Sequence, residues 1–155
     1  MQSRSDCRVV RIQRRDPELL RSLDRFHRAL IQGSSTPPEQ FMDFVAQRLG
    51  DETMLLILAL VGDEPTGYAL AFDVPEHAFM PEWQRVGYVT QFYVTPERRR
   101  QGVGQVMFDF IVRWLASRGI REVQLNVSPD NPVGNRFWRR QGFVPHRVRM
   151  KRMIG

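Results

Sequence analysis

Three arginines and two glycines lie close together at residues 98–104, in a pattern that could bind a phosphate group. The residues before them, 88–94, are mostly β-branched or aromatic and predict a strand. After them, apolar residues recur at intervals of three and four from 103 to 115, which predicts an amphipathic helix. A helix that begins in a glycine-containing turn presents unpaired N–H groups and the positive end of its dipole to an anion. We therefore predict a pyrophosphate-binding turn between this strand and this helix.

Two common phosphate-binding signatures do not fit these residues. The P-loop needs a lysine directly after its second glycine, and the only lysine of the chain is Lys151. A dinucleotide-binding fingerprint needs a third glycine where Met107 stands. The pattern that does fit is Arg-x-x-Gly-x-Gly, from Arg99 to Gly104. It resembles the acetyl-CoA-binding motif of the GCN5-related N-acetyltransferase (GNAT) superfamily.

A second segment strengthens this resemblance. After a predicted strand at 122–127 come an asparagine, a small residue three positions later, an aromatic pair and a Gly-Phe pair, in the order of the later GNAT signature. These residues are Asn131, Gly134, Phe137, Trp138, Gly142 and Phe143. Two motifs in the right order and spacing, over residues 88–143, are far more specific than either motif alone.

The resemblance implies that acetyl-CoA is the cosubstrate and that both motifs bind it. In the family, the backbone of the strand that precedes the glycine turn pairs with the pantetheine arm, and one of its amides can serve the oxyanion. The cofactor-binding residues that the resemblance implies are Phe92, Tyr93, Val94, Arg99, Arg100, Gln101, Gly102, Val103, Gly104, Gln105, Asn131, Gly134, Phe137 and Trp138.

The implied reaction is direct attack of an amine on the acetyl thioester. The amine must lose a proton, and the tetrahedral oxyanion needs a hydrogen-bond donor. Some relatives carry a Glu or His base where Tyr88 and Thr90 stand here. Neither is a good base at neutral pH, because unperturbed tyrosine has a pKa near ~10 and threonine barely titrates. The alternatives are a carboxylate that acts through water, at Glu82, Glu76 or Asp73, or an acceptor whose pKa is already low.

The departing thiolate raises a second question, at Trp138. Many relatives place a tyrosine there as the acid, whereas an indole N–H can donate a hydrogen bond but cannot deliver its proton at ordinary pH. Trp138 is therefore expected to stabilise the thiolate or to wall the pantetheine slot, with Tyr88, Tyr93 or water as the proton source. Packing beside Phe137 is the structural alternative. The candidate catalytic residues are Tyr88, Thr90, Trp138 and Glu82.

The composition favours one domain that covers residues 1–155, because 42% hydrophobic residues can form a core. No apolar run reaches the ~18–20 residues of a membrane span, so we expect no membrane contact and interpret 54–61 as a buried strand. Residues 1–6 lack the apolar segment of a secretory signal. The single cysteine, Cys7, excludes an internal disulfide and favours a cytoplasmic location.

Periodicity and turn signals predict an α/β fold, a mixed sheet flanked by helices, in the order β-α-α-β-β-β-α-β-α-β. This GNAT-like order is also what the resemblance requires. The predicted strands cover 8–13, 53–61, 66–72, 86–94, 122–127 and 147–153, and the predicted helices cover 16–31, 38–49, 103–115 and 132–141.

Charge is segregated along the chain. Residues 33–84 hold nine acidic residues and one arginine, whereas residues 85–155 hold fourteen cationic and four acidic residues. The basic part would favour the phosphates of coenzyme A, and the acidic part would favour a cationic amine acceptor. The pI near 10.6 also suggests nucleic-acid binding, but no nucleic-acid-binding signature accompanies it, and the three histidines and one cysteine lack metal-site spacing.

We therefore predict an N-acetyltransferase that acts on a primary amine of a small, cationic molecule or of a peptide, with no metal, nucleic-acid or membrane partner. A homodimer is one open option for its assembly. The alternative is a catalytically inactive acyl-CoA-binding or regulatory module of the same fold, because both proton-transfer positions, Tyr88 and Trp138, carry unusual residues.

Overall fold

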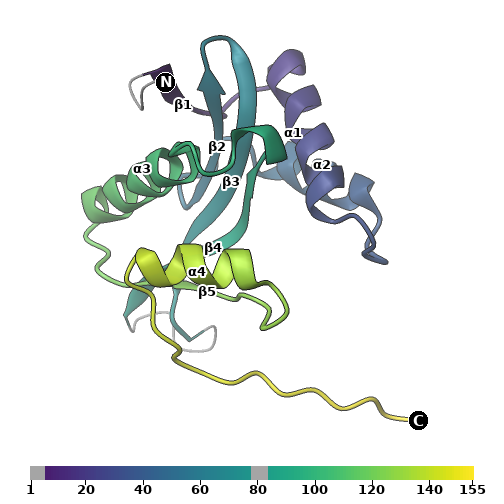
Figure 1. The fold of residues 1–155 in the computed structure, drawn as a ribbon, viewed down its shortest axis with the longest axis vertical. Coiled ribbons are helices and arrows are strands. Elements are labelled where there is room, and N and C mark those ends of the chain that lie inside the picture. The colour runs from purple at the N-terminus through teal and green to yellow at the C-terminus, as the bar shows by residue number, and fades with distance from the viewer. Residues whose placement is uncertain (1–5, 78–83) are drawn as a thin grey trace. The chain divides into compact units, whose positions relative to one another are not determined.

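A five-stranded mixed sheet forms the centre of the computed structural model, which describes residues 6–77 and 84–155 (Figure 1). Its spatial order follows the chain, β1-β2-β3-β4-β5. Neighbouring strands from β1 to β4 are antiparallel, whereas β4 and β5 are parallel. The strands are β1 (Cys7–Arg11), β2 (Met54–Val61), β3 (Glu64–Pro75), β4 (Arg85–Val94) and β5 (Val123–Leu125).

Three helices belong to the same compact unit as the sheet, Met1–Leu125. They are α1 (Pro17–Leu30), α2 (Pro38–Arg48) and α3 (Val103–Ser117). The start of α1 follows from its sequence, because the Asp16 carboxylate accepts hydrogen bonds from the Glu18 and Leu19 N–H groups. Gly119, with φ of 75°, follows α3 in the left-handed conformation that a glycine adopts easily.

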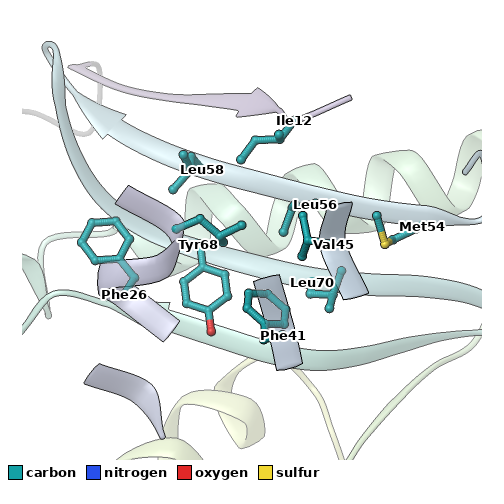
Figure 2. Packing of buried hydrophobic residues seen from close by; sticks show 10 residues of the cluster. Ile12, Phe26, Phe41, Val45, Met54, Leu56, Leu58, Tyr68 and Leu70 are labelled. Atoms are coloured by element: carbon teal, nitrogen blue, oxygen red, sulfur yellow. The ribbon is translucent and has the colours of Figure 1, made fainter. Parts of the chain in front are cut away.

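The buried strand β2 separates two apolar layers. Alternate residues of β2 and β3 pack with side chains of α1 and α2, including Phe26, Phe41 and Val45 (Figure 2). The intervening residues of β2, Leu55 and Ile57, are equally buried, and α3 contacts the sheet as well. A strand covered on both faces has no polar side, which explains the continuous apolar run of this segment.

The second compact unit, Asn126–Gly155, contains helix α4 (Pro132–Arg140). The predicted strand at 147–153 is wrong, because residues 143–155 form no regular secondary structure. Alternation of apolar and basic residues gave the strand signal, yet Val148 and Met150 are each 88% exposed. A strand forms only where its N–H and C=O groups find a neighbouring strand, and the residues described here provide none for this segment.

The other predicted elements are confirmed, with ends that differ by a few residues. The observed order is therefore β-α-α-β-β-β-α-β-α. None of the helices in the described part of the chain has the length and apolar character needed to cross a membrane.

Candidate active site

Helix α3 begins at a glycine in the left-handed conformation. Gly102, with φ of 87°, is its N-cap residue, and no side chain caps the helix there. The first helical hydrogen bond runs from the Val106 N–H to the Gly102 carbonyl, at 3.1 Å. Arg100 is also left-handed, with φ of 61°. Left-handed residues in such a turn direct successive N–H groups toward one side, and a helix N-terminus adds its dipole. This turn has the backbone chemistry of an anion site.

Two side chains that we predicted to bind the cosubstrate hold this turn in place. The Nε atom of Arg99 donates to the Val94 carbonyl at 3.0 Å, and its guanidinium lies over the Tyr93 ring. The Nε2 atom of Gln101 donates to the Glu97 carbonyl at 2.8 Å. Arg99 therefore attaches the turn to the end of β4, and Gln101 attaches it to the 3₁₀ turn Pro96–Arg98.

Strand β4 is irregular next to this turn. Leu70 of β3 is in register with Gln91, but the next residue, Ala71, is in register with Val89, which leaves Thr90 as an inserted residue. Such a bulge bends a strand and twists it locally. Pairing of β4 with β5 covers Gly87 to Val89, whereas pairing with β3 continues to Val94. The two neighbours of β4 therefore end at different points along it.

The proposed catalytic residues on β4 lie on either side of Val89. Thr90 is exposed, and its hydroxyl donates to the Leu70 carbonyl at 3.2 Å. Its proton is thus engaged in the bulge, which argues against a role as base. Tyr88 is half-buried and in register with Phe72 of β3 and Gln124 of β5. Glu82 lies outside the described residues.

The carboxylate of Asp73, proposed above as a base acting through water, has two cationic partners. It is 5% exposed and accepts from the Nε atoms of Arg85 at 2.6 Å and Arg118 at 2.7 Å. Two guanidinium groups neutralise this carboxylate and occupy both of its oxygens. Asp73 therefore ties β3 to β4 and to the end of α3, and the structure does not support it as a base.

In the second unit, Asn131 caps α4. Its Oδ1 atom accepts from the Gly134 N–H at 3.0 Å. A Cβ atom at Gly134 would lie 2.5 Å from the Asn131 Nδ2 atom, so a larger residue there would displace the amide that caps the helix. This explains the Asn-x-x-Gly spacing of the motif. Trp138 is 8% exposed and makes edge-on contacts with Phe137 and Phe143, which fits the packing role.

A group of polar residues on α1, β3 and β4 was not predicted from the sequence. His27 is buried between the helices and the sheet, and its Nδ1 atom lies within hydrogen-bond distance of Tyr68 and Gln91. The available signal was a histidine on the apolar stripe of α1, next to Leu23 and Phe26. A buried histidine on such a stripe needs a polar partner, and the partners here are far away in the sequence.

A family model described as the acetyltransferase (GNAT) family matches residues 17–143. No curated protein sequence gives a match. Among solved structures, an aminoglycoside acetyltransferase, AAC(6′)-Iy, in complex with a CoA-S-monomethyl-acetylneamine bisubstrate analogue, superposes with a TM-score of 0.80 at 19% identity, over 96% of this chain and 99% of that one.

Two further solved structures have the same fold. One is an aminoglycoside acetyltransferase, meta-AAC0020, from an uncultured soil metagenomic sample, in complex with sisomicin, with a TM-score of 0.75 at 15% identity over 97% and 98% of the two chains. The other is a GCN5-related N-acetyltransferase from Ralstonia eutropha JMP134, with a TM-score of 0.72 at 23% identity over 96% and 98%.

Proposed function

The chain belongs to the GNAT family of acetyltransferases, and from this premise we propose that it acetylates a primary amine of a small cationic molecule or of a peptide. It is an acetyl-CoA-dependent N-acetyltransferase, with acetyl-CoA as its cosubstrate. The finer proposal concerns which residues bind the cosubstrate, which carry out the proton transfers and which amine is the acceptor. The family match begins in α1 and ends after α4, which supports the prediction of a single domain.

The observation that carries the cosubstrate proposal is the uncapped start of α3 at Gly102. Pyrophosphate oxygens would accept hydrogen bonds from the backbone of residues 99–105, where the helix dipole also favours negative charge. The pantetheine arm would run along β4 beyond Val89, where β5 no longer accompanies it, and would contact Phe92, Tyr93 and Val94. Asn131, Gly134, Phe137 and Trp138 remain in the proposal through their place in the family motif.

The proposed chemistry is one displacement at the thioester carbon. The acceptor amine, once deprotonated, attacks this carbon and forms the C–N bond. The oxyanion of the tetrahedral intermediate accepts from a backbone N–H of residues 92–94. The C–S bond then breaks, and the second proton of the amine nitrogen passes to the CoA thiolate, directly or through water, Tyr88 or Tyr93. Trp138 donates a hydrogen bond to the thiolate at most, because an indole N–H does not titrate in water.

Charge and fold support a cationic acceptor. Residues 33–84 carry a strong acidic excess, and two solved structures with this fold are aminoglycoside acetyltransferases crystallised with sisomicin or with an acetylneamine-derived analogue. Aminoglycosides carry several amino groups, which are protonated at neutral pH. We therefore place aminoglycosides and polyamines first among the acceptors to be tested, ahead of amino acids and lysine peptides.

Thiol release from acetyl-CoA tests the proposal. We expect turnover above the buffer rate with at least one cationic primary amine, and mass spectrometry should show an acetyl group added to that amine. The alternative of an inactive acyl-CoA-binding module would be supported if no turnover is measured with polyamines, aminoglycosides, amino acids or lysine peptides while calorimetry shows intact CoA binding. The homodimer option is tested separately by sedimentation of the intact chain.

A further inference from the structure

Three polar side chains from distant parts of the chain meet under α1. The hydroxyl of Tyr68 donates to the Gln91 Oε1 atom at 2.8 Å. The His27 Nδ1 atom lies 3.0 Å from the Tyr68 hydroxyl and 3.2 Å from the same Gln91 oxygen. His27 is 3% exposed and Tyr68 is fully buried. The cluster joins α1, β3 and β4.

The hydrogen bonds of this cluster define the tautomer of His27. A tyrosine hydroxyl has one proton, and in this geometry Tyr68 gives it to Gln91. The two oxygen atoms that face Nδ1 are then acceptors, so Nδ1 must carry the imidazole proton. In a neutral ring the lone pair consequently lies on Nε2. An imidazole held in this way by a partner at Nδ1 has the arrangement of a histidine base.

The second nitrogen of His27, Nε2, keeps little exposure to solvent, since the residue as a whole is 3% exposed. Within residues 6–77 and 84–155, no hydrogen-bond partner is found for Nε2. The same residues contain no fully enclosed side-chain nitrogen or oxygen without a partner, so Nε2 retains a small contact with the protein surface. The ring also stacks on Phe41 of α2, with centroids 4.0 Å apart and planes 25° apart. The imidazole is therefore held at one ring face and at Nδ1, while Nε2 has no hydrogen-bond partner among the described residues.

Burial keeps this histidine neutral. Removal of the ring from water lowers the pKa of His27, and nearby Arg28 lowers it further, while the Gln91 hydrogen bond and Asp24 oppose the change. The result is a pKa below the ordinary value of about 6.5, so the neutral form predominates at physiological pH. The groups that contact the ring or act on its charge are Asp24 and Arg28 from α1, Phe41 from α2, Tyr68 from β3 and Gln91 from β4.

The cluster is attached to β4 at its bulge. Gln91 directly follows the inserted residue Thr90 and directly precedes Phe92, where the proposed oxyanion-binding segment begins. Tyr88 and Thr90 of β4 are not competent bases by their side-chain chemistry, and the Thr90 hydroxyl donates to the Leu70 carbonyl. His27 is thus a neutral imidazole next to the strand that lacks a base of its own.

We propose that His27 is the general base of acetyl transfer and that Tyr68 and Gln91 position it. The Nε2 lone pair takes one proton from the acceptor ammonium, directly or through one water, and the resulting amine attacks the thioester carbon. The imidazolium later releases this proton to solvent, while the second amine proton leaves with the CoA thiol. The inference rests on the proposed function, because it needs an amine acceptor.

The test is the pH dependence of kcat/KM for two acceptor amines of different pKa. In the wild-type protein we expect a rise through a pKa below about 6.5 that is the same for both amines, because that ionisation belongs to the free enzyme. His27→Gln should lower kcat by about 100-fold or more, which is the usual contribution of a general base. It should also abolish this rise, the acidic limb of the pH profile. The rate of the variant should then rise with pH toward the pKa of each amine.

Two further variants separate catalysis from folding. Tyr68→Phe removes a partner of Nδ1 but leaves Gln91, so it should shift the limb and lower kcat less than His27→Gln. Asp63→Asn, in the exposed turn between β2 and β3, is the control away from the cluster and should leave both parameters unchanged. Binding of CoA, measured by calorimetry, should be the same in all four proteins, which shows that each is folded.

The outcomes distinguish this inference from the function on which it rests. If the wild-type protein acetylates no amine, the proposed function fails first. If it does so and His27→Gln keeps the acidic limb, or retains kcat within a few-fold, His27 is not the base. Partial restoration of His27→Ala by added imidazole, with the limb restored, would support direct proton transfer at this position.

Discussion

Asp51 closes the turn that leads from α2 into β2. One of its carboxylate oxygens accepts from the Thr53 hydroxyl and N–H at 2.7 and 2.8 Å, and the other from Arg48 at 2.6 Å. These bonds favour the charged form, and the Thr53 hydroxyl makes the largest contribution to lowering the pKa of Asp51 from 3.8 to about 2. The carboxylate therefore stabilises the fold only while it is ionised.

We predict that Asp51→Ala lowers the free energy of unfolding at pH 7 by roughly 2 kcal/mol. The pKa is lower in the folded state, so the contribution is present above the unfolded pKa of 3.8 and is lost as the pH falls toward about 2. The difference between wild type and variant should thus shrink between these two values. Urea unfolding at pH 7, 4 and 2.5 measures it, and a constant difference at all three would contradict the argument.

Single residues also mark the limits of prediction from the sequence. The roles of Tyr88 and Trp138 could be questioned at once, because their side-chain chemistry is known without a structure. The role of His27 could not, since its partners Tyr68 and Gln91 are 41 and 64 residues away in the chain. The two arginines that bind Asp73 could not be predicted from the sequence either, and they make this candidate base a structural residue.

Among the elements, the start of α3 gives the most direct test of cosubstrate binding. Gly102→Ala and Gly102→Glu both place a side chain on a residue with φ of 87°, and each costs about 1 kcal/mol of backbone strain. Only Glu adds negative charge where the pyrophosphate would lie. We therefore predict that the Glu variant loses CoA binding, whereas the Ala variant binds with a modestly raised Kd.

Calorimetry with CoA measures this difference, and circular dichroism shows that both variants fold. The Asp109→Asn variant is a control for charge on α3 away from its first turn, and it should bind as wild type does. Comparison with dephospho-CoA separates the pyrophosphate from the 3′-phosphate, since Gly102→Glu should weaken both ligands. Equal CoA binding by the Ala and Glu variants would show that the pyrophosphate does not bind at this turn.

Elements with a local signal were predictable, and those that depend on distant pairing were not. The Asp16-Pro17 start of α1 and the apolar period of α3 are properties of a few neighbouring residues. The segment 147–153 alternates basic and apolar residues up to Lys151 but forms no strand, because pairing depends on residues elsewhere in the chain. The bulge at Thr90 gives no sequence signal, since it is a mismatch in length between β3 and β4.

At the scale of the whole molecule, the net charge of +6 is distributed unevenly between the two units. The unit 1–125 has sixteen cationic and sixteen acidic residues, whereas 126–155 has seven cationic residues and one acidic residue. The acidic excess of residues 33–84 is therefore balanced inside its own unit. Within the described part of the chain, several of these acidic residues form ion pairs with arginines. They are Glu39, Asp51, Asp63, Glu64 and Asp73.

This pairing narrows the acceptor hypothesis to fewer carboxylates than the composition suggested. Asp43 is exposed on α2, and no ion pair is found for it in the described part of the chain. Glu76 directly follows β3, and segments between strands often carry binding residues. We propose Asp43, for its exposure, and Glu76, for its place directly after β3, as the residues through which charge would attract a cationic amine.

We predict that the KM for the best cationic amine, at saturating acetyl-CoA, rises several-fold as ionic strength increases from about 0.01 to about 0.1 M. Over this range the Debye length falls from about 30 to about 10 Å, so attraction that acts beyond direct contact is screened. Asp43→Asn and Glu76→Gln should raise the KM at low salt and flatten its salt dependence, with kcat unchanged. Asp63→Asn, in the exposed turn between β2 and β3, removes the same charge at a distance from these residues and is the matched control. If the KM depends neither on salt nor on the Asp43→Asn and Glu76→Gln substitutions, or if a neutral amine is a better substrate than every cation, shape rather than charge selects the acceptor.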